Sequence, residues 1–221
     1  MRKTPFANGE FYHIYNRGVD KREVFSDDAD FFRFWLSMHL LNDHQEGIMD
    51  KWKNYKRDNA RPNLEDFRRR ELSSRRRLVE IISYCLNLNH YHLILEQIAT
   101  DGIGKFMHKI STSYTNYFNK KNDRSGSLFQ GRFKAIHIKS NAHLLYLSAY
   151  VNCNSEIHGI AKAESYRWCS FPDYLGKRND NLCNRKKIMD NFSSGRDYLK
   201  FAKESMQAQI QKKEDGKLLL E

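Results

Sequence analysis

The sequence predicts an α+β fold in which short strands alternate with longer amphipathic helices. Apolar and aromatic residues form four short strand-like runs, and they repeat every third or fourth position in the segments between these runs. The first six elements follow the order strand, helix, strand, strand, helix, strand. A chain of 221 residues is long enough for one sizeable core with an insertion and a tail, but two full domains are not expected.

The first strand is predicted at residues 11–16, where aromatic and β-branched residues precede a turn at Gly18. Ser26 or Asp27 is the expected N-cap of a helix over residues 28–41. Apolar residues in this helix recur at three- and four-residue spacing, which predicts a stripe that packs on a sheet.

Residues 43–77 lose this periodicity and become highly charged, so we interpret them as a basic insertion that carries one short helix around residue 67. Two arginine triplets lie in it, at residues 68–70 and 75–77. They either grip phosphates or form a solvated helix face, and the sequence favours neither alternative.

The next two strands are predicted at residues 78–86 and 90–95. The linker at residues 87–89 is short enough to join them as an antiparallel hairpin. A helix over residues 102–120 and a fourth strand over residues 133–138 follow.

A further helix is predicted over residues 142–154, after which the pattern becomes irregular and ends in a polar tail, expected to fray over residues 207–221. The order of the elements is that of a ferredoxin-like sandwich, an antiparallel sheet with helices on one face. We predict one domain over residues 1–176 and a C-terminal extension, partly helical or frayed, over residues 177–221. Because this fold hosts many functions, the site has to be argued separately.

The composition favours a polyanionic partner. The chain has 38 Lys and Arg against 27 Asp and Glu, a net charge of +11 and a pI near 9.4. A well-solvated basic protein is the alternative. The spacing of the four cysteines disfavours a disulfide scaffold or a zinc knuckle, since there is no close CxxC pair. A cytoplasmic protein without a membrane segment is expected, since the first ten residues lack a signal-like apolar run and no 18-residue apolar stretch follows.

Two pairs of residues suggest a site. His90 and His92 are two apart on a predicted strand, so their imidazoles project from the same face and can bind one metal ion. Tyr150 and Asn154 are four apart on a predicted helix and share one of its faces. The alternatives are a polar strand face for the histidines, a core position for Tyr150 and a helix-terminal position for Asn154.

Two imidazole nitrogens and an amide oxygen leave open positions on a divalent cation. This donor set suits Mg²⁺ or Mn²⁺ shared with a phosphate better than a closed zinc site. A tyrosine hydroxyl has an ordinary pKa of about 10, so its attack on phosphorus needs a cation and positioning, and the product is a covalent phosphotyrosine. Tyr146, one turn before Tyr150, is the competing nucleophile, but it has no ligand one turn after it.

The sequence around His90-Tyr91-His92 resembles the His-hydrophobic-His (HUH) motif of single-stranded-DNA endonucleases. Within that class it resembles the single-tyrosine group, that is, the REP-associated tyrosine transposases and their insertion-sequence relatives. The likeness covers most of residues 11–176 and rests on these segments: Tyr15-Asn16-Arg17-Gly18, Asp27-Asp28, Asn89-His90-Tyr91-His92-Leu93, Leu128-Phe129-Gln130-Gly131-Arg132-Phe133-Lys134, Tyr150-Val151-Asn152-Cys153-Asn154, and Tyr166-Arg167-Trp168-Cys169-Ser170-Phe171-Pro172-Asp173-Tyr174-Leu175-Gly176.

The resemblance implies an HUH-type fold in which His90, His92 and Asn154 bind the divalent metal and Tyr150 attacks the DNA. It further implies recognition of a hairpin in single-stranded DNA, cleavage to a 5′-phosphotyrosine and a free 3′-hydroxyl, and rejoining of strands. The chain departs from the family pattern at Leu88 and Ser155, where prolines are usual, and in its longer insertion. None of these departures removes a catalytic group.

Asn16, Arg17, Arg132 and Lys134 stand at motif positions and are the expected DNA contacts, although such residues can equally be solvated turn residues. The expected partner is hairpin-bearing single-stranded DNA, bound by a monomer or by a homodimer that exchanges its tyrosine helices. Two other functions stay open. One is a non-catalytic DNA- or RNA-binding module, and the other is a nuclease in which the metal activates water.

Overall fold

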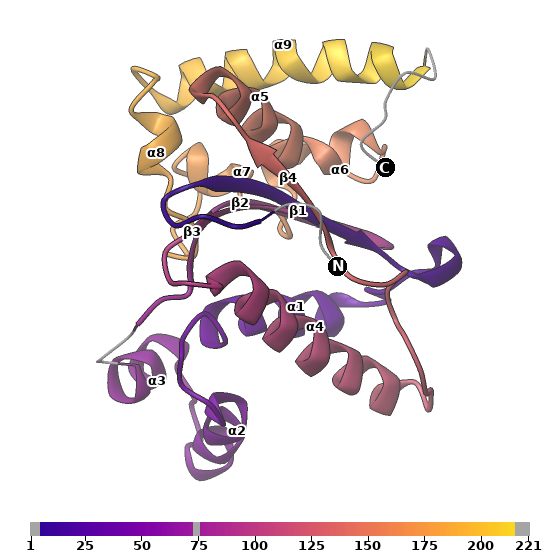
Figure 1. The fold of residues 1–221 in the computed structure, drawn as a ribbon, viewed down its shortest axis with the longest axis vertical. Coiled ribbons are helices and arrows are strands. Elements are labelled where there is room, and N and C mark those ends of the chain that lie inside the picture. Colours follow the sequence, from indigo (N-terminus) through magenta and orange to yellow (C-terminus); the bar gives the residue numbers. More distant parts are fainter. Residues whose placement is uncertain (1–4, 73–75, 215–221) are drawn as a thin grey trace.

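The computed structural model describes residues 5–72 and 76–214 and contains one antiparallel sheet with helices around it (Figure 1). The four strands occur in the order β2-β3-β1-β4, which is the ferredoxin-like arrangement. The predicted α+β class is therefore confirmed. The strands are β1 (Phe11–Arg17), β2 (Val79–Asn87), β3 (His90–Gln97) and β4 (Lys134–Ile138).

The strand register places β1 and β3 side by side at the centre of the sheet. Tyr15 of β1 lies opposite His92 of β3, and His13 lies opposite Ile94. Two residues, Leu88 and Asn89, join β2 and β3 as the predicted antiparallel hairpin. The same hairpin turn accepts a backbone hydrogen bond from Gly18, whose nitrogen donates to the Asn89 carbonyl at 2.8 Å.

Two helices, α1 (Asp28–Leu40) and α4 (Gly102–Lys121), cover the first face of the sheet (Figure 1). The α1 helix begins where predicted, because Asp27 Oδ1 accepts from the backbone nitrogen of Asp30 at 3.0 Å. The predicted stripe packs here with alternate strand residues, and this forms the first core. Its central members include Phe34, Met38, Leu93, Phe106 and Ile110.

The insertion contains α2 (Ile48–Asp58) and α3 (Leu64–Glu71). Only α3 was predicted, because the buried residues of α2 are few in a highly charged segment. Trp52 of α2 packs edge-to-face on Phe67 of α3, with ring centroids 5.1 Å apart, and both residues join the first core. The first arginine triplet ends α3, whereas Arg75 of the second lies outside the described residues.

Five further helices lie on the second face (Figure 1). The prediction of helices on one face only is therefore wrong. The physical reason is that the strands also direct apolar residues such as Ile82 and Ile94 to the second face, and these need a cover. The cover consists of α5 (Asn141–Asn152), α6 (Asn154–Ile157), α7 (Phe171–Tyr174), α8 (Lys186–Met189) and α9 (Gly195–Glu214).

The helix predicted over residues 142–154 is interrupted. It ends at Asn152, and Cys153, with φ −94° and ψ 4°, separates it from the short helix that starts at Asn154. Tyr150 and Asn154 therefore do not share one continuous helical face as predicted. Of the two predicted states of the C-terminal extension, partly helical or frayed, the structure has a helix as far as Glu214, because α9 continues to that residue and buries Gln209, and residues 215–221 lie outside the described residues.

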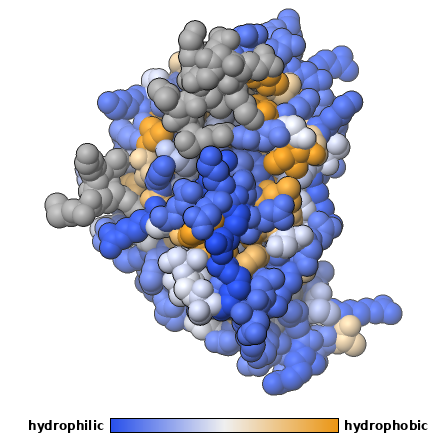
Figure 2. Space-filling model, turned by 90° about the vertical axis from the view of Figure 1, so that its right-hand side faces the viewer, coloured by the Kyte–Doolittle hydropathy of each residue, from blue (hydrophilic) through white to orange (hydrophobic). Residues whose placement is uncertain are grey.

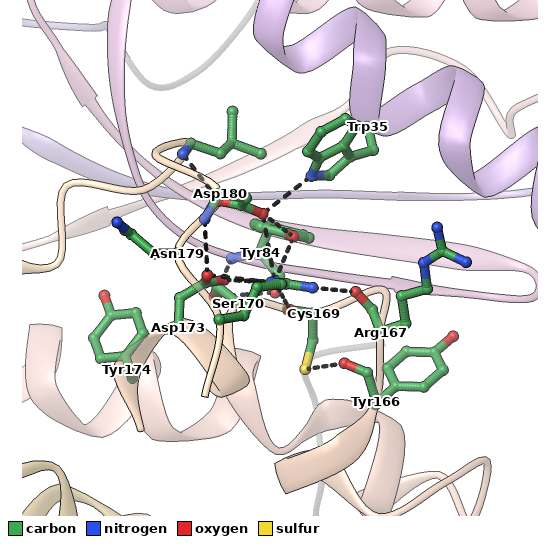
Figure 3. Close-up of polar contacts among 12 residues, drawn as sticks. Trp35, Tyr84, Tyr166, Arg167, Cys169, Ser170, Asp173, Tyr174, Asn179 and Asp180 are labelled. Atoms are coloured by element: carbon green, nitrogen blue, oxygen red, sulfur yellow. Dashed lines mark hydrogen bonds and ion pairs between the residues drawn. The ribbon is translucent and has the colours of Figure 1, made fainter. Parts of the chain in front are cut away.

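The segment after α6 is tied to the sheet by a polar cluster (Figure 3). The Arg178 guanidinium donates to Asp173 Oδ2 at 2.5 Å and to Tyr84 Oη at 2.9 Å. Asp180 Oδ2 accepts from Trp35 Nε1 at 3.2 Å, which links the same cluster to α1. The family-like segment at residues 166–176 thus contributes to a structural anchor on β2.

Candidate active site on the second face

His90 and His92 lie on the same face of β3, the one that α5 covers, and both are buried. Their imidazole centroids are 5.2 Å apart and the ring planes meet at 86°. The alternation of side chains along a strand brings them together, as the spacing suggested.

Asn89 holds the His90 ring in one tautomer. His90 Nδ1 lies 2.6 Å from Asn89 Oδ1, while Asn89 Nδ2 donates to the Lys21 carbonyl at 3.0 Å. Since that Nδ2 faces a carbonyl, the Asn89 atom next to His90 is an acceptor, and His90 Nδ1 carries the hydrogen. In its neutral form the ring therefore presents the lone pair of Nε2 on its other side.

Asn154 Oδ1 lies 3.2 Å from His90 Nε2, although both atoms are hydrogen-bond acceptors. The Nδ2 of Asn87 bridges them. It donates to Asn154 Oδ1 at 2.5 Å and lies 2.9 Å from His90 Nε2. The lone pairs of Asn154 Oδ1 and His90 Nε2 thus point at the same buried place. There the amide hydrogens of Asn87 supply a partial positive charge.

His92 pairs with His13 of β1. The two rings stack with centroids 5.1 Å apart, and His92 Nδ1 lies 2.9 Å from His13 Nε2. Burial, followed by the charge of His143, lowers the pKa of His13 to about 3. Burial and the neighbouring His13 hold the pKa of His92 well below its ordinary value. Both rings are therefore neutral at pH 7.

Three buried polar atoms of this cluster face no hydrogen-bond partner within residues 5–72 and 76–214. They are His13 Nδ1, His92 Nε2 and Asn154 Nδ2. Leaving a buried polar atom unsatisfied costs about 1–3 kcal/mol, so a native protein usually keeps such an atom for a role other than packing.

Tyr150 of α5 reaches the same cluster. Its ring stands edge-on to His92, with centroids 5.5 Å apart, and to His13, with centroids 6.1 Å apart. Tyr150 is fully buried, whereas Tyr146, one turn earlier on α5, is half-buried. The structure therefore brings Tyr150 beside the histidines, but it places it beneath the surface.

A cavity of about 170 Å³ opens beside the histidine pair. Arg17, Lys21 and Lys134 line it, together with both histidines. Asn16 also lines this cavity, but both ends of its side-chain amide form hydrogen bonds with the backbone. The Nδ2 of Asn16 donates to the Gly131 carbonyl at 3.0 Å, and its Oδ1 accepts from the nitrogen of Arg17 at 2.9 Å.

Arg132 lies apart from this cavity, in a groove of about 860 Å³ between α4 and the loop before β4. A third hollow of about 490 Å³ joins the two, because it shares Lys21 with the cavity and Phe129 with the groove. Figure 2 shows the side of the molecule that carries this loop. Its coloured surface is mostly hydrophilic, with apolar areas that are small and separate.

Sequence reasoning missed three histidine-site residues: His13, Asn87 and His158. His13 is signalled by its place in a strand of otherwise apolar and aromatic residues, and Asn87 by its place in the hairpin next to the motif. The ring of His158, 4.8 Å from that of His90, had no signal in the local pattern, because the break at Cys153 positions it.

Comparison with known proteins gives a family match. Residues 58–154 match the family model described as "Transposase IS200 like". The matched stretch is similar to the IS200-like transposases and includes both motif histidines, Tyr150 and Asn154.

The fold of the chain is also similar to a solved structure, that of a REP-associated tyrosine transposase bound to a REP hairpin. The TM-score is 0.52 at 12% sequence identity, and the match covers 82% of this chain and 87% of the other. At this identity the likeness shows the fold alone. No curated protein matches the sequence.

Two features are absent from the described residues. Within residues 5–72 and 76–214, no helix is long and apolar enough to cross a membrane. Nor does any group of three His, Cys, Asp or Glu side chains in these residues converge as metal ligands. A metal site built from these described residues would therefore include a ligand of another type, such as the Asn154 amide.

Proposed function

We propose that this protein is a transposase that cleaves single-stranded DNA beside a hairpin, with Tyr150 as the nucleophile. The phenolic oxygen gives up its proton and forms a bond to the scissile phosphorus, the bond to the 3′ oxygen breaks, and that oxygen takes up a proton and leaves as a hydroxyl. The 5′-phosphotyrosine conserves the energy of the broken bond, so a 3′-hydroxyl can reverse the reaction and rejoin strands. The observation that carries this proposal is the convergence of His90, His92, Asn154 and Tyr150 on one buried cluster.

The residues of this cluster fit a divalent cation. His90 Nε2 and Asn154 Oδ1 are acceptors that point at the same place, and His92 Nε2 is buried beside them and unsatisfied within the described residues. Two imidazoles and an amide oxygen would hold Mg²⁺ or Mn²⁺ and leave positions for phosphate oxygens. Such a cation supplies Lewis-acid polarisation of the scissile phosphate.

The burial of Tyr150 adds a requirement. Because the side chain of Tyr150 is fully buried between its own helix α5 and the sheet, the DNA phosphate reaches the hydroxyl only when the layer of α5 and α9 opens. Tyr198 of α9 holds the layer closed, since Ser148 Oγ lies 3.0 Å from its hydroxyl and Asn152 Nδ2 donates to the hydroxyl at 2.8 Å. We propose that α5 moves relative to the sheet during cleavage.

The cationic cavity offers a path for the DNA backbone. Lys134 and Lys21 are exposed beside the histidine pair, and the hollow continues along the loop before β4 to Arg132. Phosphate contacts fix the position of the strand without reading its sequence. Replacing Lys134 with Ala should weaken binding of every DNA sequence alike and lower the slope of log affinity against log salt by about 1.

One other function is supported by a specific observation. Because Tyr150 is buried, a nuclease that activates water at the same cation site, with Tyr150 in a structural role, would need no movement of α5. The two functions differ in whether a covalent protein–DNA adduct forms.

The decisive experiment is a denaturing-gel assay with labelled hairpin-bearing single-stranded DNA from the flanks of the protein's own gene. Wild type, Tyr150→Phe and the matched control Tyr146→Phe are compared with and without Mn²⁺. We expect a Mn²⁺-dependent covalent adduct in wild type and in Tyr146→Phe, and none in Tyr150→Phe.

Each other outcome selects a different function. Cleavage that persists in Tyr150→Phe without an adduct would establish a water nucleophile. Loss of the adduct in Tyr146→Phe alone would transfer the role to Tyr146. Binding of several hairpins without cleavage by any of the proteins would indicate a non-catalytic module.

A further inference from the structure

The hydrogen bond between His13 and His92 is an unusual feature of the second face. His13 is fully buried in the middle of β1, in a position where an apolar side chain would pack without a desolvation penalty. Its Nδ1 faces no partner within residues 5–72 and 76–214, so His13 itself costs stability. Packing alone therefore does not account for a histidine here.

The sheet register explains how the two rings meet. His13 lies opposite Ile94, and His92 is two residues before Ile94 on the same face, so His13 and His92 are diagonal neighbours on adjacent central strands. Tyr15 stacks on both rings, with centroids 5.1 Å from His13 and 5.7 Å from His92. The ring of Tyr150 contacts both imidazoles edge-on. Both imidazoles are thus held in a fixed orientation.

Only one of two hydrogen-bond directions is compatible with a ligand role for His92. If His92 Nδ1 carries the hydrogen and donates to His13 Nε2, the Nε2 of His92 presents a lone pair to the cluster. If His13 Nε2 donates instead, His92 carries its hydrogen on Nε2 and has no lone pair there. The direction of one hydrogen bond therefore decides whether His92 can bind a cation.

We propose that His13 is a positioning residue, which accepts the Nδ1 hydrogen of His92 and so holds the Nε2 lone pair of His92 ready for the cation. The inference rests on the proposed function, since it concerns the same cation site. It makes the two motif histidines equivalent, because Asn89 accepts the Nδ1 hydrogen of His90 in the same way. A ligand histidine whose other nitrogen is held in this way binds metal about 10- to 100-fold more tightly than one without that support.

The test uses the full-length protein and two substitutions of His13. His13→Gln keeps an acceptor, because the amide oxygen of glutamine can take the place of Nε2, whereas His13→Leu removes it. Mn²⁺ affinity is measured by isothermal titration calorimetry. The tautomer of His92 is read in the metal-free protein from the ¹⁵N shifts of its ring nitrogens. His39→Leu, which removes a buried histidine of α1 on the first face, is the matched control.

We expect His92 to carry its hydrogen on Nδ1 in wild type and in His13→Gln. Mn²⁺ affinity should fall about 10- to 100-fold in His13→Leu and stay within about 3-fold in His13→Gln and His39→Leu. Wild type with the hydrogen on Nε2, or His13→Leu with wild-type affinity, would overturn the inference and leave the proposed function standing. Failure of wild type to bind Mn²⁺ would instead overturn the metal site of the proposed function, whichever tautomer is observed.

Discussion

The two faces of the sheet bury side chains of different kinds. At the centre of the first face the strands direct residues such as Ile14, Tyr91 and Leu93 into a core of aromatic and aliphatic side chains. At the same level of the second face they direct His13, His90 and His92 towards α5. The first face thus supplies most of the hydrophobic stabilisation. On the second face, a polar cluster that carries the proposed chemistry takes the place of part of the apolar core.

The largest expected effect tests the first face. Phe106 of α4 is fully buried in the first core, and replacing it with Ala should lower the free energy of unfolding by about 3–5 kcal/mol, through lost transfer energy and the cavity left behind. Denaturant unfolding measures this loss. Mn²⁺ affinity of the folded protein should stay at its wild-type value, and a large change in that affinity would contradict the separation of the two faces.

The next effect tests the second face. Bound Mn²⁺ at about 100 times its dissociation constant should raise the unfolding free energy of wild type by about 2.7 kcal/mol. Asn154→Leu removes the amide oxygen beside His90 Nε2. Most of the Mn²⁺-dependent gain in unfolding free energy should therefore be lost in this variant, and differential scanning calorimetry with and without Mn²⁺ measures that loss. Asn42→Leu is the control. Asn42 is a buried asparagine that binds the backbone of β2, and its loss should lower stability but preserve the Mn²⁺ gain.

Acid should destabilise the second face through its neutral histidines. The pKa of His13 is lowered to about 3 and that of His92 lies well below its ordinary value, whereas the unfolded chain titrates near 6.5. The unfolded state therefore binds more protons below pH 6.5. Stability is complete above that pH and is lost as the pH falls from 6.5 towards 3. His13 should contribute a loss of about 1 kcal/mol at pH 5.5, and His92 should add a loss in the same direction.

Unfolding of the metal-free protein at pH 7.5 and 5.5 measures this loss. His13→Leu should lose less stability than wild type between the two pH values, because one neutral buried histidine is gone. His108→Leu, which replaces an exposed histidine of α4, should lose as much as wild type. Equal losses in all three proteins would show that the buried histidines do not cause the acid sensitivity.

The sequence predicted the first face better than the second. The stripe of α1 and the spacing in α4 lie on regular helices, so periodicity alone indicated which residues are buried. On the second face, His90 and His92 could be paired because strand alternation is equally regular. The other members of that cluster could not be found in this way, because tertiary contacts bring them together.

Asn154 shows why. Its predicted place on a continuous helix was wrong, since the chain breaks at Cys153, yet its amide oxygen still reaches His90. The four-residue spacing to Tyr150 thus pointed to Asn154 as a site residue, although the continuous helix assumed for it is not present. His13 reaches the site through the pairing of β1 with β3, and a pairing register between strands some 80 residues apart is not contained in any local pattern.

The smallest expected effect separates packing on the second face from catalysis. Tyr198 binds Ser148 and Asn152 of α5, so Tyr198→Phe should lower the unfolding free energy by about 1 kcal/mol. Tyr174→Phe is a matched control, because its hydroxyl contacts Ser83 and the carbonyl of Ile82 in β2 rather than α5. Both variants should lose similar stability in denaturant unfolding. If movement of α5 limits access to Tyr150, only Tyr198→Phe should form the Mn²⁺-dependent adduct faster than wild type in single-turnover assays. Equal rates in both variants would show that Tyr150 becomes accessible without release of this contact, and that the polar ties of α5 serve stability alone.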